Sequence, residues 1–412
     1  MGVGLSKKKT MSVTPLSSRQ TYIDWLRIFA IIGVLLFHSA MPYVADWEWH
    51  IKNPETSNTL LELNDFMSRW RMPLLFFISG AVSYFMLQRY NGSAFLGQRF
   101  LRLFVPLIVG ILVIVPPQIY LERVVAGYQG NFWQFYLHMF KTGAYPKGDL
   151  SWHHLWFICY LLVYDILLTP LFVHLMSKGR KLMQRLEWLA KGSRIYFLAL
   201  PGVLVYTFWM NRFRATHDLI HDYGYFPYYL FFVLVGFICI ANQSFMDSLA
   251  RNRRTSFAIA VLSILIINYC RWNKIEPWFA TGYFNPDYRF YLFAFVGGVN
   301  AYMWVFTAVG YGKQYLNRPW KGMAYVNQAV YPFYILHQTV IVIITFYLVK
   351  VPDPIGMKYI FTVIVTFLLS MCIFHLFIRP FAVMRFLFGM KGTGKKKEKE
   401  NLIVHPVAVT VL

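Results

Sequence analysis

The sequence is dominated by apolar runs of about twenty residues, separated by short segments in which the charged residues gather. In hydrocarbon only helices and closed barrels satisfy all their backbone hydrogen bonds, and runs of this length are typical of helices. Hydrophobic residues make up 57% of the 412-residue chain and charged residues 14%, which excludes an ordinary soluble domain. We therefore predict an all-α polytopic bundle. Ten spans are expected, at about 22–45, 71–88, 101–120, 153–176, 194–210, 226–243, 255–271, 288–310, 327–349 and 359–379.

The distribution of positive charge predicts the orientation of these spans. With a cytoplasmic N-terminus, 26 of the 40 Lys and Arg residues lie in cytoplasmic segments and 13 in outer loops, and Arg27 lies within the first span. This bias follows the positive-inside rule, so the net charge of +22 does not indicate a nucleic-acid partner. The expected organisation is a basic cytoplasmic tail over residues 1–20, a transmembrane domain over 21–380 and a Lys/Glu-rich cytoplasmic tail over 381–412.

The first span carries two ionisable residues on one face, Arg27 and His38. Eleven residues at about 100° each return to nearly the same angle, and they place the two side chains roughly 16 Å apart along the axis. Asp24 lies one turn before Arg27 and can pair with it. Asp165, deep in the fourth span, needs a cation, and Arg27 is at a plausible depth. Ionisable residues inside a membrane indicate a functional site, although Arg27 can also snorkel and His38 can bond a neighbouring helix.

Other polar residues fall at defined depths in this topology. Arg71 opens the second span at the outer face, and His154 opens the fourth, where it can belong to an interfacial aromatic belt or a carbohydrate platform. Arg99 and Arg102 are three residues apart on the cytoplasmic side, so both can point at one anion, although ordinary positive-inside placement also explains them. His337 lies near mid-membrane in the ninth span, where a neutral core histidine is equally expected.

The sequence contains no motif that indicates a metal site or a disulfide framework. There is no HExxH, and the histidines lie on different spans without carboxylates at ligand spacing, so no metal site is expected. The four cysteines lie in or at the ends of apolar segments and resemble small hydrophobic residues more than a disulfide framework.

Taken together, these residues resemble the integral-membrane acyltransferase-3 family over roughly residues 19–380. The motifs that carry the resemblance are Arg27-x10-His38, Arg71-Met-Pro followed by Phe-Phe-Ile-Ser-Gly, Arg99-x-x-Arg102 before Pro106, His154-Leu-Trp-Phe, and Tyr334-Ile-Leu-His337. Within the family the chain looks most like the branch that includes the glucan succinyltransferase of bacterial periplasmic glucan synthesis. Leu63-Asn64-Asp65-Phe66 through Arg71 and the stretch around Phe226-Pro-Tyr-Tyr are similar to that branch.

The resemblance implies O-acylation of an extracytoplasmic carbohydrate or glucan at the bacterial inner membrane, with a cytoplasmic acyl-CoA as donor. Acetyl-CoA and succinyl-CoA both remain open. The layout of the residues agrees with this function, because Arg27, Arg99 and Arg102 can bind the phosphates of CoA from the cytoplasmic side. The lipid bilayer and the acceptor are the expected partners, and the oligomeric state is open.

His38 would then lie where the thioester meets the sugar, and we expect it to act as the general base. A covalent acyl-histidine is the alternative. Arg71 or His154 would orient the sugar or stabilise the oxyanion, and His337 is the remaining candidate catalytic residue.

Two other classes of protein compete with this interpretation. A small-molecule transporter would line its permeation path with the charged stripe, but the sequence has no two-fold repeat of spans and a transporter would release no CoA. A non-catalytic scaffold would tolerate replacement of His38.

Overall fold

The computed structural model describes residues 20–392 except 210–211, 214 and 282–286. Residues 1–19 of the predicted N-terminal tail and residues 393–412 of the predicted C-terminal tail therefore lie outside the described residues, whereas residues 381–392 are described. Within them the chain is helical and forms no strand, which confirms the all-α bundle; Ala144 and Leu150 make an isolated bridge.

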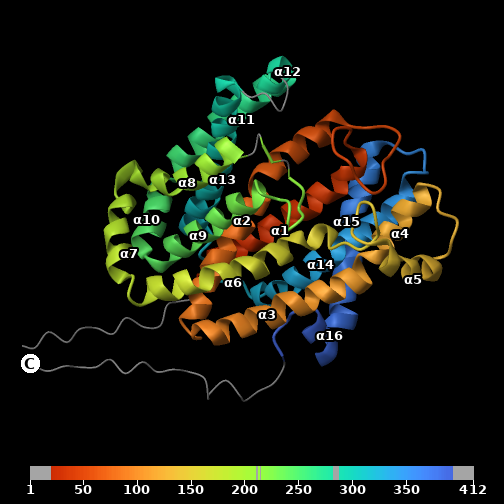
Figure 1. The fold of residues 1–412 in the computed structure, drawn as a ribbon, viewed down its shortest axis with the longest axis horizontal. Coiled ribbons are helices and arrows are strands. Elements are labelled where there is room, and N and C mark those ends of the chain that lie inside the picture. Colours follow the sequence, from red (N-terminus) through yellow and green to blue (C-terminus); the bar gives the residue numbers. More distant parts are fainter. Residues whose placement is uncertain (1–19, 210–211, 214, 282–286, 393–412) are drawn as a thin grey trace, which may run out of the picture.

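The α-helices follow one another in a single bundle (Figure 1). They are α1 Thr21–Ala40, α2 Asn58–Leu87, α3 Gly92–Val109, α4 Pro116–Val125, α5 Phe132–Thr142, α6 Trp156–Met176, α7 Arg180–Leu186, α8 Leu200–Trp209, α9 Tyr225–Ala241, α10 Gln243–Arg251, α11 Arg253–Trp272, α12 Pro277–Thr281, α13 Tyr288–Tyr315, α14 Met323–Leu348, α15 Ile355–Ile373 and α16 Ala382–Leu387. Short 3-10 helices are η1 Met41–Tyr43, η3 His153–Leu155, η4 Glu187–Ala190 and η5 Gly192–Leu198, and π-helical turns are η2 Gly110–Ile114 and η6 Phe374–Ile378.

The number of long spans is lower than the expected ten. Among the described residues, eight helices or helix pairs are long and apolar enough to cross a membrane, and a ninth arises if α9 and α10, bent by 104°, form one span. The expected span at 194–210 is instead η5 followed by α8. A ten-residue α-helix rises about 15 Å, half the thickness of a bilayer core, so α8 does not cross by itself.

The second span is longer than its apolar run. Its helix begins at Asn58 and continues through Pro73, so Arg71 lies well inside α2 instead of opening it. The added turns are polar, and ion pairs hold them in helical form: Asp65 pairs with Arg69 at 3.0 Å and with Arg271 of α11 at 3.3 Å. These pairs explain why hydropathy alone placed the start of the helix too late.

Two glycines set the closest helix contact of the bundle. A Cβ on Gly80 of α2 would lie 1.9 Å from the carbonyl oxygen of Val233 in α9. A Cβ on Gly236 of α9 would lie 1.9 Å from the carbonyl oxygen of Phe77. Because only glycine permits this separation of the backbones, α2 and α9 pack as a small-residue pair, as is common between membrane helices.

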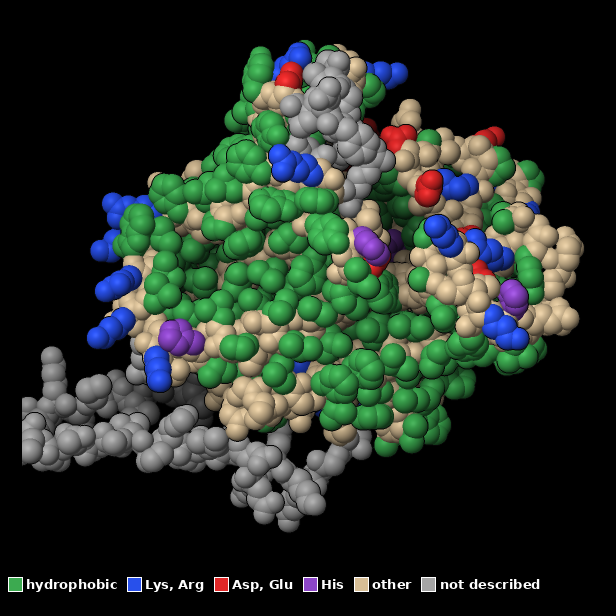
Figure 2. Space-filling view, viewed as in Figure 1, with side chains coloured by type: hydrophobic (Ala, Val, Ile, Leu, Met, Phe, Trp, Pro, Cys, Tyr) green, Lys and Arg blue, Asp and Glu red, His purple; other side chains and the backbone are tan. Residues whose placement is uncertain are grey.

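Apolar side chains also cover the outside of the bundle. On α15, Ile360, Phe361, Ile364 and Leu368 are each more than half exposed. Figure 2 shows hydrophobic side chains over most of the visible face, with Lys and Arg gathered along the left edge and Asp and Glu toward the upper right. This pattern is the one expected of a lipid-facing belt between two aqueous ends.

The two ends of the bundle are defined by different contacts. At one end the start of α1 meets the segment between α13 and α14, where Thr21 donates to Asn317 Oδ1 from its backbone and its hydroxyl. We call this the α1 N-terminal end. At the opposite end, η1, η3 and the loops around α4 and α5 come together, and His50 after η1 contacts Glu122 of α4. We call this the η1 end.

The close contact between α2 and α9 predicts that Gly80→Ala and Gly236→Ala each destabilise the protein by roughly 2 kcal/mol or more, because the methyl group forces two backbones apart. Thermal unfolding of the purified protein in detergent measures this. Gly356→Ala is the control, since its Cβ would meet nothing within 4 Å. If all three variants melt alike, the two helices do not pack at these glycines.

Candidate active site

Two histidines from distant parts of the sequence meet inside the bundle. His38 lies near the end of α1 and His337 lies in the middle of α14. His38 Nδ1 is 2.8 Å from His337 Nε2, and the rings stack with centroids 5.1 Å apart. His337 is fully buried, and its Nδ1 lies 2.6 Å from the carbonyl oxygen of Tyr334. The sequence predicted both residues as site candidates, and the structure brings them into direct contact.

The partners of His337 determine the tautomers of both rings. A carbonyl oxygen only accepts, so His337 Nδ1 carries the proton and donates it to Tyr334. In a neutral imidazole, Nε2 is then an acceptor, and His38 Nδ1 must donate to it. The remaining nitrogen of His38, Nε2, therefore has a lone pair, and no described residue hydrogen-bonds to it. The arrangement leaves His38 oriented and ready to accept a proton.

A tryptophan from the loop after η1 packs against His38. The Trp49 ring stacks on His38 at a centroid distance of 5.5 Å, on an imidazole that also stacks on His337. Trp49 lies outside every predicted span, so neither periodicity nor depth in the membrane could place it beside His38. Packing against two rings restricts rotation of His38, as a pre-organised base requires.

His154 belongs to the same cluster. It is buried at the junction of η3 and α6, and its Nε2 donates to the carbonyl oxygen of Ile335 at 3.0 Å. Its ring lies 5.4 Å from that of His337. The hydroxyl of Tyr334 donates to the backbone carbonyl of His154, so α14 holds this residue from two sides. His154 Nδ1 is buried and has no partner among the described residues.

Arg71 is the buried cation of the cluster. Its guanidinium lies 3.4 Å from the centre of the Phe37 ring, next to His38 in sequence. No described carboxylate pairs with it, and its Nε is buried without a hydrogen-bond partner. A buried guanidinium with unfilled donors is suited to an oxyanion or carboxylate.

Arg27 lies at the other end of α1. Its guanidinium is paired with Asp24 at 3.0 Å, as the sequence predicted, and it also donates to Asn327 Oδ1 of α14 at 2.5 Å. The side chain is 30% exposed. Arg27 therefore presents positive charge at the α1 N-terminal end, far from the histidine cluster.

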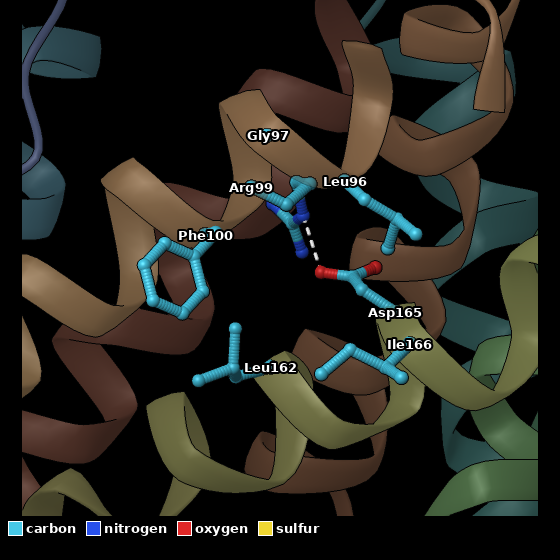
Figure 3. A pocket seen from close by; sticks show the side chains of 7 residues that line it. All are labelled: Leu96, Gly97, Arg99, Phe100, Leu162, Asp165 and Ile166. Atoms are coloured by element: carbon cyan, nitrogen blue, oxygen red, sulfur yellow. Dashed lines mark hydrogen bonds and ion pairs between the residues drawn. The ribbon is translucent and has the colours of Figure 1, made fainter. Parts of the chain in front are cut away.

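Arg99, and not Arg27, is the partner of Asp165. Arg99 Nε pairs with Asp165 across the interface of α3 and α6, so the expected pairing of Asp165 with Arg27 is wrong. Figure 3 shows the two side chains facing each other in a pocket whose other lining residues are Leu96, Gly97, Phe100, Leu162 and Ile166. The Asp165 carboxylate is only 3% exposed, so water cannot neutralise its charge and it pairs with Arg99 of the adjacent helix α3. Arg102 is partly buried one turn later, and a common anion for Arg99 and Arg102 stays a prediction.

Comparison with known proteins assigns the chain to a family. A family model described as an acyltransferase domain (Acyl_transf_3) matches residues 20–376. The chain therefore belongs to the acyltransferase-3 family and is a multi-pass membrane acyltransferase.

Individual relatives match over a shorter stretch. The chain is similar to the glucans biosynthesis protein C of Escherichia coli O6:K15:H31 (strain 536), with 28% identity over 160 residues, which are 38% of this chain and 40% of the relative. The proteins of that name from Escherichia coli K12 strains DH10B and MC4100 match with the same identity and coverage. The matched part of the chain thus spans about two fifths of these relatives. No solved structure matches the chain.

The buried ion pair predicts that Asp165→Asn destabilises the protein by about 3–5 kcal/mol, because it leaves Arg99 charged and uncompensated between two helices. Thermal unfolding in detergent tests this. The matched control is Asp247→Asn, which breaks a pair with Lys313 in which the carboxylate is 52% exposed, and which should change stability by about 0–1 kcal/mol. Equal melting temperatures for the two variants would show that Arg99 finds other compensation.

Proposed function

We propose that this protein transfers an acyl group from a cytoplasmic acyl-CoA to a hydroxyl of an extracytoplasmic carbohydrate. The observation that carries the proposal is the hydrogen bond from His38 Nδ1 to His337 Nε2, which leaves His38 Nε2 as a base in a chain of the acyltransferase-3 family. The acyl group would be acetyl or succinyl. A glucan is the acceptor class we favour, because the relatives are named for glucan biosynthesis.

The reaction requires one proton to be removed and returned. The acceptor hydroxyl oxygen attacks the thioester carbonyl carbon and forms the new C–O bond, while its proton moves to His38 Nε2. The tetrahedral oxyanion then collapses, the C–S bond breaks, and His38 returns the proton to the leaving thiolate. No external acid, base or redox partner is needed, so atoms and charge balance.

His337 acts through His38. Its Nε2 accepts the Nδ1 proton of His38, so it holds the ring in the reactive tautomer and stabilises the imidazolium that forms. His337 is in turn fixed by the carbonyl of Tyr334. This pair takes the place of a carboxylate orienter, and Asp24 cannot serve as one because it lies about 21 Å away along α1.

Arg71 is the group we assign to the developing negative charge. Its buried guanidinium lies beside Phe37 and has a donor without a partner among the described residues. A donor that is desolvated before the reaction stabilises an oxyanion more strongly than one in water. With a succinyl donor, the same cation would also suit the free carboxylate of the acyl group.

Donor and acceptor would approach from opposite ends. Arg27, partly exposed at the α1 N-terminal end, would bind phosphates of CoA, with Arg99 and Arg102 of α3 as further candidates. The acceptor would enter at the η1 end, where Trp49 and His154 border the histidine pair. We infer a bacterial inner-membrane location from the Escherichia coli relatives. We infer that both termini are cytoplasmic because residues 1–20 carry four Lys and Arg and the chain from Arg379 on carries seven.

The first test measures release of free CoA thiol by the purified protein in proteoliposomes, with acetyl-CoA or succinyl-CoA as donor and a glucan mixture as acceptor. Acceptor-dependent release is expected, and His38→Ala should lower its rate on the order of 10²–10⁴-fold because the base is lost. The matched control is His174→Ala, an exposed histidine near the end of α6, which should keep the wild-type rate. A transporter would release no thiol, and release that survives His38→Ala would remove this residue from the mechanism.

The role of His337 predicts that two substitutions at this position lower kcat to different extents. His337→Ala removes the acceptor for His38 Nδ1 and should lower kcat on the order of 10²-fold or more with KM for the donor little changed. His337→Gln keeps a carbonyl acceptor at a similar reach and should recover part of the loss. A purely structural role would instead lower the melting temperature and the fraction of active protein without rescue by Gln.

A further inference from the structure

Three side chains that have no role above converge at the η1 end. His50 follows η1, Glu122 lies in α4 and His153 begins η3. One ring nitrogen of each histidine and one oxygen of the carboxylate all lie within 4.8 Å of one another. The three residues come from separate segments, so no sequence spacing could reveal them as a set. Each is partly exposed, which leaves the cluster open to an ion from solution.

His153 presents an unused nitrogen in this cluster. Its Nδ1 lies 2.6 Å from Ser151 Oγ, and its backbone N–H donates to the same oxygen at 2.9 Å. With Nδ1–H donating to the hydroxyl oxygen, Nε2 carries the lone pair. That Nε2 is buried and has no partner among the described residues. The residue also holds φ at 40°, a strained value for a side chain with a Cβ. A strained backbone therefore supports an unsatisfied ligand atom.

Glu122 is held in place by groups that leave one oxygen for the cluster. Its Oε1 accepts from the Tyr145 hydroxyl at 3.2 Å and from Arg123 at 3.4 Å. Its Oε2 lies 2.5 Å from His50 Nδ1. Arg123 does not leave the cluster with excess positive charge, because it also pairs with Asp149 at 2.8 Å. The two carboxylates balance Arg123 and leave one negative charge to meet a cation.

His50 also contacts Gln338, a side chain that could orient it as a metal ligand. Its Nε2 lies 3.2 Å from Gln338 Nε2, and Gln338 donates to Gln118 Oε1 at 3.1 Å. The other atom of the same amide, Gln338 Oε1, is buried without a partner among the described residues. If a metal replaced the proton on His50 Nδ1, the imidazole proton would move to Nε2. A turn of the Gln338 amide would then supply Oε1 as its acceptor, the kind of outer contact that orients metal-bound histidines.

We propose that His50, Glu122 and His153 bind one zinc ion, with a further position open to water or a substrate group. Two imidazoles and one carboxylate with an open position are a ligand set of zinc in proteins. Tetrahedral ligands at about 2.0–2.2 Å from the ion lie about 3.4 Å from one another, so His50 Nδ1 and Glu122 Oε2, now 2.5 Å apart, would separate slightly to admit it. The ion would tie the loop after η1 to α4 and η3. Because Trp49 in that loop stacks on His38, the zinc would also hold the Trp49 ring in place against His38.

The test measures zinc directly and does not depend on acyl transfer. The purified full-length protein is analysed by plasma mass spectrometry as isolated, then stripped with a chelator and titrated with Zn²⁺ against a competing indicator. The wild type should hold about one zinc per chain, as expected for one three-ligand site. His153→Ala and Glu122→Gln should each weaken binding by more than about tenfold. His138→Ala, an exposed histidine in α5, is the matched control and should bind as the wild type does.

Thermal unfolding separates loss of the site from loss of the fold. In chelator, Glu122→Gln should melt within a few degrees of the stripped wild type, and zinc should raise the melting temperatures of the wild type and of His138→Ala but not that of Glu122→Gln. Wild-type protein without saturable zinc binding would overturn the proposal. Binding that both site variants retain, or that His138→Ala weakens equally, would overturn it as well.

Discussion

One turn of α14 holds the centre of this molecule together through hydrogen bonds to three other segments. Between Tyr334 and Gln338, this turn bonds His154 at the start of α6, His38 of α1 and His50 after η1. An unpaired polar group in an apolar interior costs free energy, so each of these bonds restricts how the segments can be placed. The positions of α1, α6 and the η1 loop around α14 are therefore restricted by the same turn of α14 that gives His38 its reactive tautomer.

The interior satisfies its other charges in a different way. Arg99 and Asp165 neutralise each other between α3 and α6, and Arg27 is paired with Asp24 where α1 begins. The charge of each of these arginines is balanced by a carboxylate of the chain, whereas no described carboxylate pairs with Arg71 and no described residue hydrogen-bonds to His38 Nε2. A hydrogen-bonding atom at a buried site that has no partner in the protein has to bind water or a ligand. The contrast separates the groups that hold the helices together from those that are available for chemistry.

Much of the fold could be predicted because the hydropathy of a segment indicates whether it lies in the membrane or in water. The apolar runs located the eight long spans, the bent segment that begins with α9 and the short helix α8, and the Arg27–Asp24 pair followed from helical spacing alone. The errors arose where tertiary contacts overrode hydropathy. Ion pairs of Asp65 extend α2 beyond its apolar run, and the ten residues of α8 pack beside α9 and α13 without the length to cross by themselves.

The sequence by itself determined that the chain is a helical membrane protein, and its motifs named His38, Arg71, His154 and His337 as site residues. Only the tertiary structure decided which of them touch, that His337 orients His38, and that Asp165 belongs to Arg99. It also brought Trp49 to His38 and gathered His50, Glu122 and His153 at one point. The physical reason is that periodicity fixes the face and depth of a residue within its own helix, whereas contacts between helices depend on how the whole bundle packs.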